Sequence, residues 1–74
     1  MVWDISWAAE RAGEAMRYLA EHYPEWAASG ELHPHQDAAH DAAVAEDQEK
    51  YLEALRDFVR TGRRVALEAR GRVA

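Results

Sequence analysis

The chain contains no cysteine, only two prolines and only four glycines among its 74 residues. The absence of cysteine excludes disulfides and thiolate metal sites. A chain this short builds only a small core, so a partner chain or a metal held by histidine and carboxylate side chains could add stability. We expect one small domain that covers residues 1–74.

Long apolar runs are also missing. No stretch approaches the roughly 18 consecutive apolar residues that a membrane span requires. Residues 1–7 lack the basic segment and the long apolar segment of a signal peptide. These absences predict no membrane association and a cytoplasmic location.

Catalytic motifs are absent as well. There is no glycine-rich phosphate loop, and none of the three serine and threonine residues (Ser6, Ser29 and Thr61) lies beside a histidine in the sequence. A small helical protein also has little room for a water-excluding pocket. We therefore expect neither an enzyme nor a cofactor.

The first half of the sequence predicts one helix and a short turn. Asp4 is a good N-cap, and apolar residues recur every three or four positions from Ile5 to Tyr23. Pro24 should end this helix near His22, which gives a helix over 5–22. Proline at the start and glycine at the end of the next segment predict a short helical turn over 24–29.

The second half predicts a long helix over 35–70. After Pro34 there is no further proline and no glycine until Gly62. A break at 47, with Asp47 as a new N-cap, or at 62 is the alternative. We favour a continuous helix because Glu46, Asp47 and Gln48 include none of the usual helix breakers. The predicted fold is an all-α helical hairpin.

The two helices differ in length, which predicts self-association. At about 1.5 Å per residue, the first helix spans about 27 Å and the second about 54 Å. The first helix would leave an apolar stripe of the second in water, so we expect a helical bundle completed by a homodimer or a larger even-numbered assembly. The stripe consists of Tyr51, Leu55, Phe58, Val59 and Ala66.

Charge is distributed unevenly along the chain. Residues 1–55 carry twelve acidic and three basic side chains, whereas residues 56–74 carry six arginines and two acids. We interpret the basic end as lying against the acidic part of the same chain or of a second copy. The alternative is nucleic-acid binding through Arg56, Arg60, Arg63 and Arg64, which the net charge of −5 disfavours.

Two further sets of residues are candidate sites. Tryptophan, tyrosine and arginine dominate protein interfaces, so Trp7, Arg11, Tyr18 and Trp26 could contact a partner, although the aromatic rings could equally lie over their own helix. Histidine and aspartate are ligands for zinc and other divalent metals. The candidate ligands are His33, His35, Asp37, His40 and Asp41, for which a solvated loop and first helical turn is the favoured interpretation.

These observations favour a small helical protein–protein interaction or accessory protein that acts as a homo-oligomer. One version is an acidic inhibitor or regulator of a basic partner. A nucleic-acid-binding protein and a metal-binding protein are the alternatives.

Overall fold

A computed structural model describes residues 3–73, which form a rod of 48 × 20 × 15 Å. The described residues are helical almost throughout and contain no strand, so the predicted all-α class is confirmed. The elements follow in the order α1 (Ile5–His22), η1 (Pro24–Ala28), η2 (Gly30–Leu32), α2 (His33–Val44) and α3 (Gln48–Val73).

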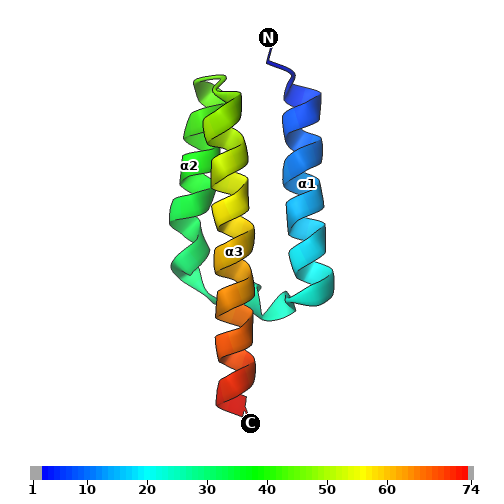
Figure 1. Ribbon diagram of the computed structural model, residues 1–74, viewed down its shortest axis with the longest axis vertical. Coiled ribbons are helices and arrows are strands. Elements are labelled where there is room, and N and C mark those ends of the chain that lie inside the picture. The colour runs from blue at the N-terminus through cyan, green and yellow to red at the C-terminus, as the bar shows by residue number, and fades with distance from the viewer. Residues whose placement is uncertain (1–2, 74) are drawn as a thin grey trace.

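The three α-helices lie side by side along the rod (Figure 1). α1 and α3 run in the same direction, whereas α2, which lies between them in the sequence, runs in the opposite direction. α3 packs against both other helices, and its C-terminal part extends beyond them. No helix in the described part of the chain is long and apolar enough to cross a membrane.

The ends of α1 are as predicted. The Asp4 side chain accepts hydrogen bonds from the backbone N–H groups of Ser6 and Trp7, which caps the first turn. The helix ends at His22, and the Tyr23 N–H donates to the Leu19 carbonyl before Pro24 begins η1. The predicted turn over 24–29 corresponds to η1.

The favoured continuous helix over 35–70 is wrong, because the chain reverses at residues 45–47. Glu46 has a φ of 55°, a left-handed conformation that is usually adopted by glycine at the end of a helix. The Asp47 N–H then donates to the Ala42 carbonyl, which closes the end of α2. The Asp47 carboxylate accepts from the Lys50 N–H and caps α3, as the alternative break at 47 predicted. Gly62 lies inside an unbroken α3.

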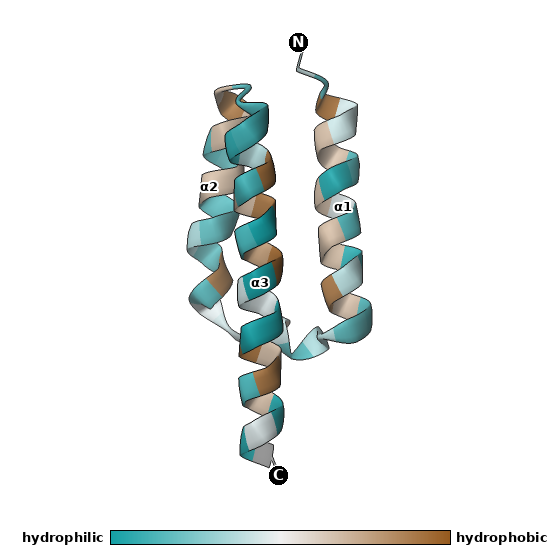
Figure 2. Cartoon of the chain, viewed as in Figure 1, coloured by the Kyte–Doolittle hydropathy of each residue, from teal (hydrophilic) through white to brown (hydrophobic). Residues whose placement is uncertain are grey.

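This reversal lets one chain bury most of the apolar stripe of α3. One core cluster joins the three helices through Ala8, Ala42 and Tyr51. The Tyr51 hydroxyl donates to the Ala8 carbonyl at 2.6 Å, and burial raises the pKa of this hydroxyl. A second cluster joins Leu19, Leu32 and Phe58. Figure 2 shows the resulting asymmetry, with the apolar residues of α3 on the side toward α1.

Candidate protein interaction groove

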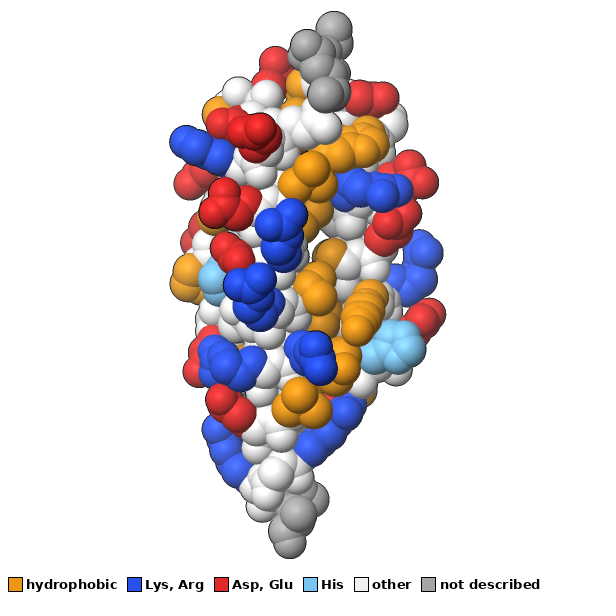
Figure 3. All heavy atoms as spheres, viewed as in Figure 1, with side chains coloured by type: hydrophobic (Ala, Val, Ile, Leu, Met, Phe, Trp, Pro, Cys, Tyr) orange, Lys and Arg blue, Asp and Glu red, His pale blue; other side chains and the backbone are white. Residues whose placement is uncertain are grey.

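A hollow in the surface lies between α1 and α3. It has a volume of about 740 Å³ and combines an apolar floor with charged walls. Figure 3 shows apolar side chains along this groove and basic side chains beside it on α3. Its lining comes from Arg11, Glu14, Ala15 and Tyr18 of α1 and from Leu52, Leu55, Arg56, Val59, Arg60 and Arg63 of α3.

The floor is a short apolar seam on α3. Leu52, Leu55 and Val59 follow the three- and four-residue spacing of one helical face. Leu52 remains 37% exposed, and Tyr18 on the opposite wall remains 39% exposed. Large apolar side chains therefore stay in contact with water inside the groove.

Three arginines of α3 form the basic wall. Arg56, Arg60 and Arg63 are about one helical turn apart and exposed, and none of them forms an ion pair within residues 3–73. Arg63 also lies 6.0 Å from the centre of the Tyr23 ring, a cation–π contact. On the α1 wall, Arg11 is already neutralised by Glu14 at 2.7 Å.

The other arginines of α3 are paired with acids of the same chain. Arg64 contacts Glu31 at 2.8 Å and Glu68 at 3.0 Å. Arg70 contacts Glu25 at 2.9 Å and donates to the His22 carbonyl at 2.7 Å.

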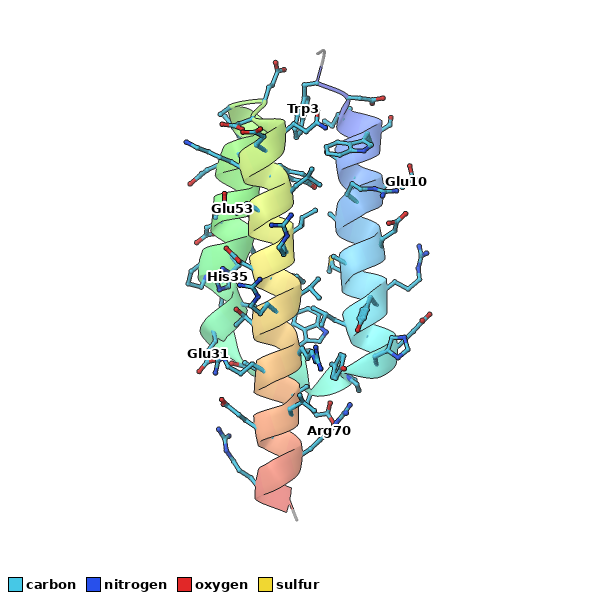
Figure 4. The ribbon with its side chains drawn as sticks, viewed as in Figure 1. Trp3, Glu10, Glu31, His35, Glu53 and Arg70 are labelled. Atoms are coloured by element: carbon cyan, nitrogen blue, oxygen red, sulfur yellow. The ribbon has the colours of Figure 1, made fainter. Side chains whose placement is uncertain are left out.

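Figure 4 shows Arg70 reaching from the lower part of α3 toward the turn after α1. Its guanidinium lowers the pKa of the Glu25 carboxyl by hydrogen bonding. The predicted contact between the basic end and the acidic part of the chain is therefore observed for Arg64 and Arg70, but not for the groove arginines.

The predicted partner residues divide into two groups. Arg11 and Tyr18 line the groove. Trp7 is half-buried and packs against the Trp3 and Tyr51 rings, with a centroid distance of 6.1 Å to each. Trp26 packs edge-on against Phe58 at 5.4 Å. These two tryptophans hold their own chain together.

The predicted self-association stripe is largely internal. Three of its residues are buried within the chain: Tyr51, Phe58 and Ala66. The prediction that a single chain leaves this stripe in water is therefore wrong. Leu55 and Val59 are half-buried and reach the floor of the groove. Self-association therefore needs a different physical basis.

The histidine cluster is dispersed along α2. His33, Asp37, His40 and Asp41 are exposed, whereas His35 is half-buried and its Nε2 lies 3.0 Å from Thr61 Oγ1. Within residues 3–73, no three histidine, aspartate or glutamate side chains are arranged to hold a metal ion. The structure does not assemble the predicted candidates into a metal site.

A smaller hollow of about 350 Å³ lies on the other side of α1. Ala12 and Met16 of α1 face Ala39 and Ala43 of α2 across it, with Phe58 among the residues of α3 that line it. α1 therefore has a hollow on each side of its contact with α3.

Sequence reasoning missed the groove because the reversal at residues 45–47 was not favoured. Leu52 and Ala15 were not predicted to belong to a site. The available signal was the apolar spacing of Leu52, Leu55 and Val59 beside arginines at 56, 60 and 63. Comparison of the chain with protein-family models, with curated proteins and with solved structures finds no match.

Proposed function

We propose that this protein is a protein–protein interaction module that binds an amphipathic helix of another polypeptide in the groove between α1 and α3. The observation that supports this proposal is the apolar seam of the groove beside three arginines that lack acidic partners in the described chain. Apolar contact would supply affinity, and the arginines would select the partner.

A helix suits the shape of the groove. The groove follows α3 from Leu52 to Arg63, about 17 Å at 1.5 Å per residue, which is enough for about three turns of another helix. Leu52, Leu55 and Val59 present a ridge at the spacing that another helix packs against. Helices that lie in such grooves bind through residues at three- and four-residue intervals. A docked helix would extend the three helices to a four-helix arrangement.

The basic wall of the groove favours a helix with an acidic flank. Arg56 and Arg60 are four residues apart, and Arg63 follows three residues later. Carboxylates at helical spacing on the incoming helix could meet all three guanidinium groups. The expected partner segment therefore has an apolar seam with aspartate or glutamate beside it.

Nucleic acid fits this site less well. The apolar seam offers no charge or hydrogen bond to a phosphate backbone, and the chain has a net charge of −5. The acidic-regulator version would use Asp41, Asp47, Glu53 and Asp57 on the outer side of α2 and α3. That surface has no apolar seam comparable with Leu52, Leu55 and Val59, so the groove is the better-supported site.

Two designed peptides test the proposal. Each has the length of α1, with leucines at three- and four-residue spacing, and the flanking positions carry glutamate in one peptide and lysine in the other. Fluorescence anisotropy should show at least about tenfold tighter binding of the glutamate peptide, with weakening at high salt.

The matched variants locate the binding site. Arg56→Glu with Arg60→Glu should reverse the peptide preference, whereas Lys50→Glu on the opposite side of α3 should not. The proposal fails if the glutamate peptide binds no better than the lysine peptide, or if the double variant leaves the preference unchanged. Tighter binding of duplex DNA than of either peptide, lost in the same double variant, would favour the nucleic-acid alternative.

A further inference from the structure

We infer that the helix bound in the groove runs antiparallel to α1 and α3, with acidic residues in its N-terminal turns and a lysine or arginine in its last turn. This inference rests on the proposed function, because it describes the partner of the same groove. It adds a basic end and a direction to the acidic flank of that helix.

A second, acidic hollow adjoins the groove at the start of α3. Leu52 lines both hollows, so the two meet at this side chain. The other residues that line the acidic hollow include Trp3, Glu46, Asp47 and Glu49. Figure 4 shows Trp3 between the starts of α1 and α3. From Glu49 to Arg63, α3 spans about 21 Å, so a helix of about four turns would extend from the acidic hollow to the far end of the groove.

The acidic hollow offers unpaired carboxylates to a cation. Glu46 and Glu49 are exposed, and neither forms an ion pair within residues 3–73. Asp47 is already engaged, because its carboxylate accepts from the Lys50 N–H. A lysine or arginine of the bound helix would meet the two glutamates beside the Trp3 ring, and an aromatic ring also attracts a cation. This end therefore favours a basic residue on the partner.

The opposite end of the groove carries the opposite charge. Arg60 and Arg63 line it, and neither has an ion-pair partner in the described part of the chain. Figure 3 shows acidic side chains over the first turns of α3 and mainly basic ones farther along it. A helix that fills both hollows is therefore complementary when it carries acids at one end and a base at the other.

The direction follows from the charge preferences of helices themselves. The backbone dipole favours acidic residues in the first turn of a helix and basic residues in its last turn. A helix with both features places its first turns beside Arg60 and Arg63 and its last turn in the acidic hollow. α1 and α3 both begin at the acidic end, so the bound helix runs antiparallel to both (Figure 1). The parallel direction would need basic residues in the first turn and acidic residues in the last, which destabilises a helix.

Peptide binding to the full-length chain tests the basic end. The lysine-ended peptide has the length of α1, leucines at three- and four-residue spacing, glutamates beside them in its first three turns and two lysines in its last turn. The control peptide has glutamine in place of both lysines. Fluorescence anisotropy should show about two- to fivefold tighter binding of the lysine-ended peptide, because exposed ion pairs are individually weak.

Charge variants locate this gain. Glu46→Gln with Glu49→Gln should abolish the difference between the two peptides. Glu53→Gln with Asp57→Asn is the matched control, because it removes the same charge from the hollow between α2 and α3 and should preserve the difference. Circular dichroism of both double variants separates loss of binding from loss of the helical fold.

A spin label on the lysine-ended peptide tests the direction. The protein has no cysteine, so a label can be attached through a single cysteine at either end of the peptide without labelling the protein. In spectra of the isotope-labelled protein, a label at the C-terminus of the peptide should broaden the amide signals of Glu49 and Leu52. A label at the N-terminus should instead broaden those of Arg60 and Arg63.

The outcomes separate the inference from the proposed function. The direction is overturned, and the function stands, if the peptide binds but its C-terminal label broadens Arg63 and not Leu52, or if each label broadens both ends equally. The basic end is overturned if the lysines give no gain, or if the gain survives in Glu46→Gln with Glu49→Gln. If neither peptide binds, whether the groove stays empty or a second copy of the chain covers it, the inference and the proposed function both fail.

Discussion

Gly13 lies inside α1 and Gly62 lies inside α3, and their surroundings differ. A Cβ atom added at Gly62 would lie 2.8 Å from Leu19 Cδ1 and 3.3 Å from Leu32 Cδ2, and both leucines are fully buried. A Cβ atom added at Gly13 would meet nothing within 4 Å. The absence of a side chain is therefore required at Gly62 and not at Gly13.

Alanine at these two positions should have opposite effects. Gly62→Ala should lower the free energy of unfolding by about 1–2 kcal/mol, because overpacking of a core exceeds the helix-propensity gain of up to about 1 kcal/mol. Gly13→Ala should raise it by up to about 1 kcal/mol. Urea denaturation at one protein concentration measures both. Equal stabilisation by the two substitutions would show that α1 does not approach α3 at Gly62.

The contact between Glu25 and Arg70 should make stability depend on pH. The folded chain holds the Glu25 pKa below its ordinary value of 4.5, so the contact stabilises the fold above that value and is lost as the pH falls through the folded pKa. Glu25→Gln should therefore lower the melting temperature near neutral pH but not in strong acid. Glu21→Gln is the control, since Glu21 forms no ion pair within residues 3–73. A constant difference between Glu25→Gln and the wild type across the acid range would contradict this account.

At the scale of elements, the ends of α1 were predictable because strong local signals fix them. Asp4 caps its start, and Pro24 follows its end. The end of α2 was not predictable in the same way. The residue with the left-handed conformation is Glu46. Glycine or asparagine at that position would have indicated the end of a helix, whereas glutamate does not. The tertiary contacts of Ala42 and Tyr51 stabilise a reversal that local propensity does not favour.

Two substitutions at this reversal should differ in their effect on stability. Asp47→Ala removes the hydrogen bond to the Lys50 N–H and should cost about 0.5–2 kcal/mol, the usual effect of losing an N-cap. Glu46→Gly should be neutral or stabilising, because glycine adopts a positive φ without strain. Thermal melts monitored by circular dichroism measure both changes. A stable Asp47→Ala variant with a destabilised Glu46→Gly variant would argue for a continuous helix.

α1 should be the least protected helix. It lies between the two hollows, and it packs against α3 less extensively than α2 does. Hydrogen exchange should therefore be faster at residues 12–16 than in the middle of α3, because regions with few buried contacts open at lower free energy. Tyr51→Phe removes the hydrogen bond to the Ala8 carbonyl and should accelerate exchange in the first half of α1. Uniform protection of all three helices would contradict this description.

At the scale of the whole molecule, sequence reasoning identified the all-α class and most of the side chains that line the groove, but not their arrangement. Arg11, Tyr18, Leu55 and Val59 were each predicted to contact a partner, and all four line one groove. Arg56, Arg60 and Arg63 were considered only for nucleic acid. Their relation to the apolar seam depends on α2 occupying the other side of α3, which no local signal specified.

We propose that a helix of another chain occupies the groove between α1 and α3. The most direct measurement is chemical-shift mapping of the isotope-labelled protein during addition of the glutamate peptide. We predict perturbations that concentrate at Tyr18, Arg56, Val59 and Arg60, which line the groove, and that leave Ala38 and Asp41 on the opposite side of the molecule unchanged. Perturbations confined to Ala38, Asp41 and their neighbours, or none at saturating peptide, would contradict the account.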